Sequence, residues 1–172
     1  MEAARQARAL AAEADAIDDL IMATMAMAPP LLHLKRTDEA LAALEEALVQ
    51  AEVQGRGTAE MALRNLHLQA LAQTERVADG IRAGFKAIER AGQVGTVDHY
   101  VGFVAHVSTL YYQAGAHVDA WNMLESAERG LKGRGDKPEA LAKVEALIEA
   151  LRMDLGPERV KAVMAECEAR RG

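Results

Sequence analysis

Aromatic residues and proline are scarce in this sequence, and their scarcity restricts the fold. Of its 172 residues 3% are Phe, Trp or Tyr, and 4 are Pro. A β-sheet needs aromatic and β-branched side chains to fill its faces. Ala and Leu, which are abundant here, are strong helix formers. The composition therefore predicts an all-α protein.

Cysteines, long apolar runs and an excess of positive charge are lacking as well. The single Cys167 has no partner for an internal disulfide, which favours a reducing, cytoplasmic compartment. No stretch approaches the ~18 uncharged apolar residues of a membrane-spanning helix, and the first residues lack the apolar region of a signal peptide. The net charge of −6 disfavours non-specific nucleic-acid binding. We therefore expect neither a membrane nor a nucleic acid as partner.

A recurrence at a spacing of 40 residues is the main pattern that the sequence contains. Small residues recur at Ala40, Gly80 and Ala120, at Ala47, Ala87 and Ala127, and at Gly55, Gly95 and Gly135. Apolar residues recur at Ile21, Met61, Val101 and Leu141, and at Leu31, Leu71, Tyr111 and Leu151. Small residues seven apart share one helical face, where a neighbouring helix can approach closely. The pattern predicts a row of helix hairpins.

Glycine and proline divide the chain into segments of helical length. After a helix from about 38 to 54, the breaks predict helices near 59–73, 75–92, 97–114, 117–132, 137–153 and 157–171. The expected start signals are N-caps at Thr58 and Thr96, a capping box of Asp136 with Glu139, and Pro157 at a first helical position. Connections of two to six residues between these helices make consecutive helices antiparallel neighbours.

The first forty residues are less regular. Residues 2–28 read either as one long helix or as two helices with a break near Asp15, and Pro29-Pro30 is expected to end the helix. Met22, Met25 and Met27 either fill an irregular core or form a surface for binding or self-association. We expect residues 1–36 to be an irregular first repeat that caps residues 37–172, with one domain overall.

Segment 101–134 resembles a tetratricopeptide repeat (TPR), the hairpin unit of α-solenoids. The family's apolar, small and aromatic places hold Val104, Val107, Ser108, Tyr111, Ala120, Leu124 and Ala127. The unit before it departs from the pattern, since Arg64, His67 and Gly84 stand at places that the family makes apolar. The resemblance spans about 21–171, although the repeat of this chain has a longer period than that of the family. With its longer units, the chain resembles the divergent TPR-like arrays of large bacterial signalling proteins and transcription activators. It implies a short right-handed α-solenoid of stacked antiparallel hairpins.

Catalytic, cofactor and metal motifs are not found in the sequence. There is no Gly-rich phosphate loop and no His-Glu-x-x-His pair. His99 and His106 lie two helical turns apart, roughly 10 Å, and read as ordinary helix residues. We therefore expect a protein that is not an enzyme and takes no cofactor. The side chains expected in the core instead are Cys167, Trp121, Phe103, Phe85 and Tyr111.

The resemblance also implies a concave surface, lined by the first helix of each hairpin. Carried over by position, its candidate partner-binding residues are Asn65, Gln69, Gln73, Thr109, Tyr112, Gln113, Glu149 and Arg152. Asn and Gln can pair with the backbone amides of a peptide, and Tyr provides contact area at a low entropic cost. The same residues also suit an ordinary solvated helix face.

Two functions fit this sequence. The first is a non-catalytic interaction or scaffold module that binds a peptide or partner helix in the concave groove. The second is a regulatory or sensor segment of a larger signalling or transcription-activator protein, because residues 3–14 match the second helix of a unit whose first helix is missing. In both, the partner is a protein or peptide, and self-association through the Met-rich segment is compatible with either.

Overall fold

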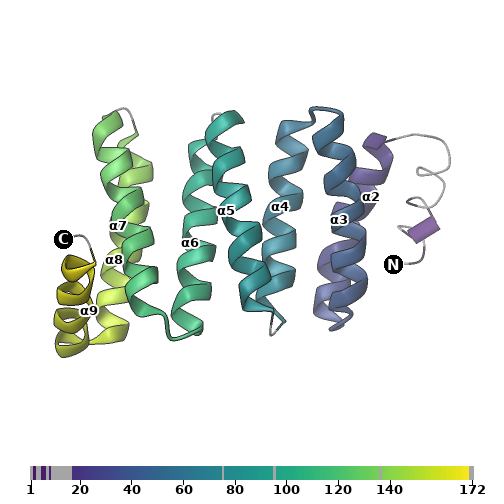
Figure 1. The fold of residues 1–172 in the computed structure, drawn as a ribbon. Coiled ribbons are helices and arrows are strands. Elements are labelled where there is room, and N and C mark those ends of the chain that lie inside the picture. The colour runs from purple at the N-terminus through teal and green to yellow at the C-terminus, as the bar shows by residue number, and fades with distance from the viewer. Residues whose placement is uncertain are drawn as a thin grey trace. The chain divides into compact units, whose positions relative to one another are not determined.

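In the computed structural model, helices provide the regular secondary structure of every part that is described (Figure 1). The structure describes residues 2, 5, 6, 8, 17–74, 76–94, 96–135 and 137–170. The helices are α2 (Ile17–His33), α3 (Thr37–Val53), α4 (Gly57–Ala72), α5 (Val77–Val94), α6 (Val97–Gln113), α7 (His117–Arg134), α8 (Pro138–Leu155) and α9 (Pro157–Ala169). The prediction of an all-α protein is confirmed. None of these helices is long and apolar enough to cross a lipid bilayer.

The helices begin at intervals of about 40 residues, as the recurrence in the sequence predicts. The first helices of the hairpins begin at Ile17, Gly57, Val97 and Pro138, and the second helices at Thr37, Val77, His117 and Pro157. The recurring alanines are almost fully buried, at 0–1% exposure for Ala40, Ala47, Ala87, Ala120 and Ala127. Small buried side chains let helix backbones approach closely. One sequence repeat therefore corresponds to one helix hairpin.

The chain divides into two compact units, the first ending at Asp79 and the second beginning at Gly80. In the first unit, α2 packs on α3 and α4, and α3 packs on α4. Its core includes Leu31, Leu44, Met61 and Leu63, each at most 1% exposed. Full burial of such a side chain contributes about 1.5–3 kcal/mol, which is what fixes these helices on one another.

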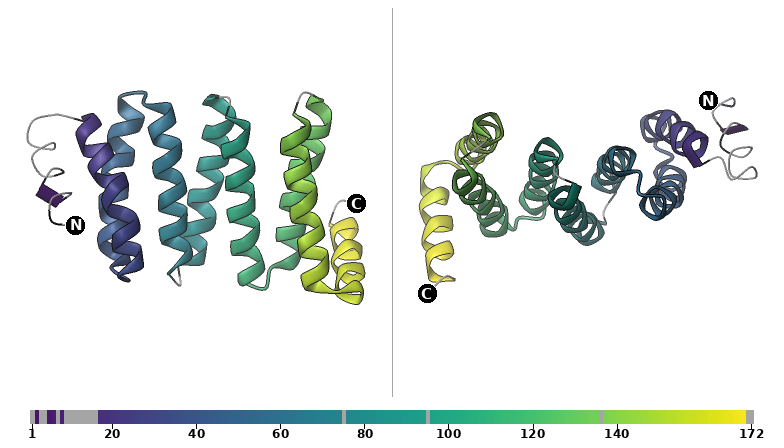
Figure 2. Two further views of the ribbon diagram at one scale, coloured as in Figure 1. Left: turned by 180° about the vertical axis from the view of Figure 1, so that it is seen from behind. Right: turned by 90° about the horizontal axis from the view of Figure 1, so that it is seen from above.

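In the second unit, α8 packs on both α6 and α7, and α9 packs on α7 and α8. Its core includes Trp121, Leu124 and Val144, and Phe103 of α6 is buried as well, each at most 2% exposed. Seen from above, α6, α7 and α8 appear nearly end-on while α9 appears from its side, so α9 crosses them at a large angle (Figure 2). A single residue, Gly156 with φ 73° and ψ 163°, makes this change of direction between α8 and α9.

Most of the predicted helix boundaries agree with the structure to within two residues. Of the predicted helix start signals, only some are confirmed. Pro157 occupies the first turn of α9 as predicted. Thr58 is not an N-cap: the Glu60 N–H donates to the Arg56 carbonyl at 2.8 Å, so α4 has already begun. Thr96 is the N-cap residue of α6, yet its hydroxyl makes no capping hydrogen bond. Asp136 lies outside the described residues.

The prediction that Pro29-Pro30 ends the helix is wrong, because α2 continues through both prolines to His33. Each proline removes one helical hydrogen bond and costs up to about 3 kcal/mol. Leu31 and Leu32, in the turn that follows, are 1% and 6% exposed. Their burial, about 1.5–3 kcal/mol each, offsets the loss.

The methionines before these prolines differ in their surroundings. Met27 is 4% exposed and belongs to the core, whereas Met22 is 65% exposed. Met25 is half-buried. α2 itself begins at Ile17, so the alternatives for residues 2–16, including a break near Asp15, fall mostly outside the described residues.

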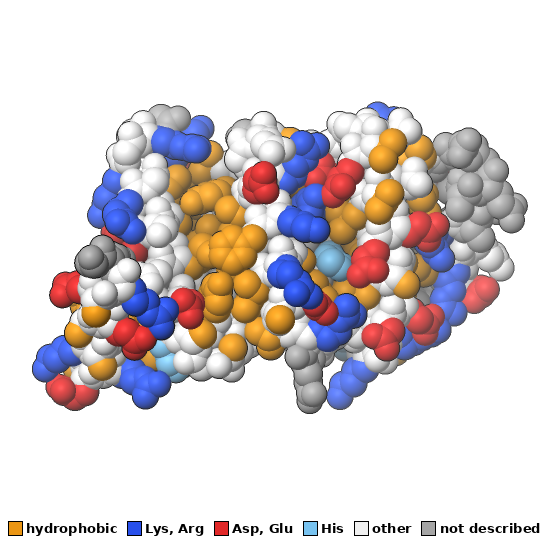
Figure 3. All heavy atoms as spheres, in the orientation of Figure 1, with side chains coloured by type: hydrophobic (Ala, Val, Ile, Leu, Met, Phe, Trp, Pro, Cys, Tyr) orange, Lys and Arg blue, Asp and Glu red, His pale blue; other side chains and the backbone are white. Residues whose placement is uncertain are grey.

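The core predictions are confirmed for Trp121, Phe103 and Cys167, and Tyr111 packs half-buried against the same core. Phe85 is the exception, with 46% of its surface exposed. The buried residues of α5 are Gly80, Gly84, Ala87 and Ala91, a stripe of small side chains. Phe85 lies beside that stripe rather than on it. On the face shown in Figure 3, hydrophobic side chains gather between α7 and α5.

Candidate functional site

Three of the residues predicted to bind a partner line one groove of the second unit. Thr109, Tyr112 and Gln113, near the end of α6, face Leu147, Ala150 and Asp154 of α8 across a hollow of about 370 Å³. Leu124 of α7 and Leu151 of α8 also line it. We call this hollow the α6/α8 groove. Apolar side chains line it together with a few polar groups, as is usual for a surface that takes a ligand.

Hydrogen bonds within α6 determine which polar groups of this groove can reach a ligand. The hydroxyls of Ser108 and Thr109 both donate to the Ala105 carbonyl, at 2.9 Å each. Since their protons are engaged by the helix, these hydroxyls offer a ligand only acceptor oxygens. Donors come instead from the Gln113 amide, which is exposed, and from the Tyr112 phenol.

Tyr112 is held in place by packing. Its ring meets the His117 ring edge-on, with 5.1 Å between the ring centroids. His117 begins α7 directly after the turn at Gly115. The short turn between α6 and α7 thus fixes the direction of the aromatic side chain in the groove.

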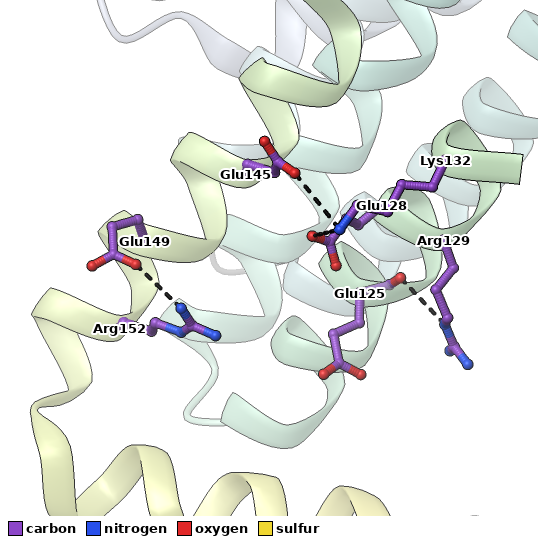
Figure 4. A network of polar contacts seen from close by, with 7 residues as sticks. All are labelled: Glu125, Glu128, Arg129, Lys132, Glu145, Glu149 and Arg152. Atoms are coloured by element: carbon purple, nitrogen blue, oxygen red, sulfur yellow. Dashed lines mark hydrogen bonds and ion pairs between the residues drawn. The ribbon is translucent and has the colours of Figure 1, made fainter. Parts of the chain in front are cut away.

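Glu149 and Arg152 were predicted to lie on the same surface as Tyr112, but the structure gives them a different groove. They lie on the flank of α8 opposite Ala150 and Asp154, in a hollow of about 280 Å³ between α7 and α8. We call it the α7/α8 groove. Figure 4 shows both side chains on α8, with the charged side chains of α7 beside them. Positions taken over from a repeat pattern give the residues on a helix but not which neighbouring helix each flank meets.

Asn65, Gln69 and Gln73 belong to α4 in the first unit, where Gln69 and Gln73 are exposed and Asn65 is half-buried. None of them lines a described hollow of that unit, whose groove lies between α2 and α3 and includes Met27, Leu31 and Glu39.

α4 instead carries a cluster of ion pairs. Arg64 pairs with Glu60 at 2.9 Å and with Glu52. The His67 Nε2 lies 3.5 Å from the carboxylate of Glu45, while burial lowers the pKa of His67. Arg64 and His67, which depart from the TPR pattern, therefore have partners of their own on α3 and α4. This cluster accounts structurally for the departure.

A third hollow of the second unit, about 570 Å³, lies where α6 and α8 begin. Helix N-termini attract anions, but Asp98 and Glu139 line this hollow together with Lys137. The Lys143 ammonium donates to Asp98 at 2.7 Å, and this bond lowers the pKa of the Asp98 carboxyl. The acidic groups at both helix starts offset the attraction for an anionic ligand.

Metal and cofactor sites have no visible basis in the described ranges. There, no three His, Cys, Asp or Glu side chains come together in a way that could hold a metal ion. His99 packs beside Phe103 with 6.2 Å between ring centroids, and burial lowers the pKa of His106. The only thiol of the chain, Cys167, is buried and lies 3.9 Å from the Val118 carbonyl.

Sequence reasoning missed the residues that complete the two grooves of the second unit. Leu147, Ala150 and Asp154 complete the α6/α8 groove, and Trp121 and Glu125 belong to the α7/α8 groove. The helical periodicity of α8 could have placed Ala150 and Asp154 on one flank and Glu149 and Arg152 on another.

Comparison of the chain with protein-family models and with curated protein sequences finds no match. The features of this chain that bear on its function are therefore the grooves and the repeat of helix hairpins.

Proposed function

We propose that this chain is a TPR-like protein-interaction module that binds a peptide segment or partner helix in the α6/α8 groove, without catalysis. The observation that carries the proposal is the convergence of Thr109, Tyr112 and Gln113 with apolar residues of α8 around one hollow. The TPR-like character is supported by the repeated helix hairpins and by the motif in segment 101–134, although the period of about 40 residues is longer than that of the family.

The lining of the groove indicates the chemistry of the ligand. Leu147, Leu151 and Leu124 suit an apolar anchor side chain, whose burial drives docking. The Gln113 amide can pair with a peptide backbone, and Tyr112 offers a rigid ring of large area. Recognition of this kind places an apolar residue in the hollow and leaves polar contacts at its edge.

The proposal is tested by selecting ligands from a phage-displayed library of random peptides on the intact chain. We expect enriched peptides to share an apolar residue, and synthetic copies to bind in fluorescence anisotropy. Replacing both Tyr112 and Gln113 by Ala should weaken binding about tenfold or more, since aromatic anchors dominate such contacts.

Two further variants make this test specific. Ala150→Glu places a bulky charge in the groove from an exposed position and should also abolish binding. Gln69→Ala with Gln73→Ala on α4 is the matched control and should leave the affinity unchanged. No enrichment of peptides, or equal binding by the double Tyr112/Gln113 variant and the wild type, would contradict the proposed function.

A further inference from the structure

The α7/α8 groove carries a charge pattern that differs from that of the α6/α8 groove. Four glutamates line it, Glu125 and Glu128 from α7 and Glu145 and Glu149 from α8. Arg152 is the one cationic residue among its lining residues. The residues that line the groove therefore carry more negative than positive charge, on a chain whose net charge is −6.

A cation is already held between the two rows of glutamates. The Lys132 ammonium lies 2.7 Å from Glu128 of its own helix and 3.6 Å from Glu145 of α8 (Figure 4). Half of the Lys132 side chain is exposed. The spacing of the two helices thus lets a single ammonium interact with carboxylates on both sides.

Trp121 supplies a second, independent feature of this groove. Its side chain lines the hollow and is 2% exposed, and its buried indole N–H has no hydrogen-bond acceptor among the described residues. The Arg152 guanidinium lies over its ring, 5.5 Å from the centroid, and donates to Glu149 at 3.3 Å. A cation over the face of Trp is attracted by the ring. The groove therefore contains an aromatic ring over which a cation is already held.

The residues that line the α7/α8 groove include none from α9. α9 has 13 residues against 18 in α8. It lies against the start of α7, where Arg170 pairs with Asp119 at 3.1 Å and Cys167 lies beside Val118. Trp121 and the glutamates lie further along α7, beyond these contacts.

We propose that the α7/α8 groove binds a basic peptide segment of a partner protein. A Lys or Arg side chain of the peptide lies between Glu145 and Glu149, and its charge takes the place of Arg152 over Trp121. Charge complementarity selects this ligand over an acidic peptide. The site lies on the flank of α8 opposite the α6/α8 groove, so neither proposal depends on the other.

The test uses the intact chain and a fluorescein-labelled oligolysine peptide. Trp121 is the only tryptophan of the chain, so its fluorescence reports directly on this groove. We expect saturable binding by anisotropy together with a change in Trp121 emission, both weakening as salt is added. An oligoglutamate peptide of the same length should not bind.

Charge-matched variants separate the groove from general surface attraction. Glu145→Gln with Glu149→Gln should weaken oligolysine binding about tenfold. Glu158→Gln with Glu168→Gln on α9 removes the same charge outside the groove and should keep the wild-type affinity. Trp121→Phe keeps an aromatic ring whose face attracts a cation less strongly, and should weaken binding several-fold with the helical content unchanged.

Three results would overturn the proposal: no saturable binding of oligolysine, equal loss of affinity in the two pairs of glutamate variants, or binding without any change in Trp121 emission. The Tyr112/Gln113 variant of the α6/α8 groove should bind oligolysine normally. Its outcome therefore distinguishes a failure of this proposal from a failure of the proposed function.

Discussion

Lys35 has a backbone conformation that this chain otherwise gives to glycine. Its φ is 57°, and the glycines with positive φ include Gly55 at 65° and Gly115 at 75°. After α2, the N–H groups of Lys35 and Arg36 donate to the carbonyls of Leu32 and Leu31. The same pair of bonds follows α3 at Gly55 and α6 at Gly115. All three helices end in a Schellman motif, and at one of them a lysine adopts the left-handed conformation.

Lys35→Gly should therefore stabilise the protein. A non-glycine residue in the left-handed region costs about 1–2 kcal/mol, part of which the greater entropy of glycine in the unfolded chain offsets. We expect the free energy of unfolding to rise by about 0.5–1 kcal/mol, measured by urea denaturation followed by circular dichroism.

Two substitutions control for the side chain itself. Lys35→Ala removes the charge but keeps the strained backbone, so it should leave the stability nearly unchanged. Gly115→Ala should lower it by about 1 kcal/mol, because an added Cβ meets no atom within 4 Å and the cost is the backbone strain alone. Stabilisation by Lys35→Ala equal to that by Lys35→Gly would refute the explanation.

At the scale of elements, a network of ion pairs that includes a buried charge connects α3 with α4. The Glu60 side chain is fully buried, and its carboxylate accepts a hydrogen bond from Arg64 Nε at 2.9 Å. Arg64, itself 13% exposed, also reaches Glu52 on α3. The Glu60–Arg64 pair lies within α4, and the contact of Arg64 with Glu52 joins α4 to α3 at a place where the TPR pattern has an apolar residue.

Removing one partner of this pair should be strongly destabilising. Glu60→Ala leaves the Arg64 guanidinium with less compensation in a largely buried position, and such changes cost about 3–5 kcal/mol. Arg64→Ala should also be destabilising, because it removes one partner of the buried Glu60 carboxylate and the link to Glu52 on α3. The measurement is the shift in the urea midpoint followed by circular dichroism.

A double variant separates the buried charge from the packing. Glu60→Met with Arg64→Leu replaces both charges by apolar groups of similar length and should recover most of the stability that either single variant loses. Single-variant losses below about 1 kcal/mol would show that Glu60 is not an essential part of the α3–α4 contact.

At the scale of the whole molecule, each unit contains a histidine whose pKa is lowered. Burial lowers the pKa of His67 in the first unit, although nearby Glu45 acts in the opposite direction, and Arg64 and Arg76 lower it further. Burial alone lowers the pKa of His106 in the second unit. Both folded-state values therefore lie below the ~6.5 of an unfolded chain.

The stability of the chain should fall as the pH drops through about 6.5. The unfolded chain binds these protons first, so the free energy of unfolding decreases until the pH is below the folded-state pKa values, by at most about 1.4 kcal/mol per pH unit for each histidine. Asp98, whose pKa is lowered by Lys143, loses its contribution only at lower pH. Urea denaturation at a series of pH values from 7.5 down to 5.5 measures the onset of this fall around pH 6.5.

His67→Gln and His106→Gln should each reduce this pH dependence, and the double variant should remove most of it. A double variant with the same slope as the wild type would place the titrating groups elsewhere.

The sequence alone determined the helices and their period. Alanine and leucine at helical spacing, with glycine at the turns, gave boundaries close to those of α3 through α9, because these signals act within a few residues of the backbone. The burial of Trp121, Phe103 and Cys167 followed from the same periodicity.

Only the tertiary structure decided how these helices are used. Helix α2 continues through Pro29 and Pro30 because the burial of the leucines that follow offsets two lost hydrogen bonds. The tertiary structure also separated Tyr112 from Arg152, because opposite flanks of α8 meet different helices. Local signals fix where a helix begins and ends, whereas packing between helices decides which side chains share a groove.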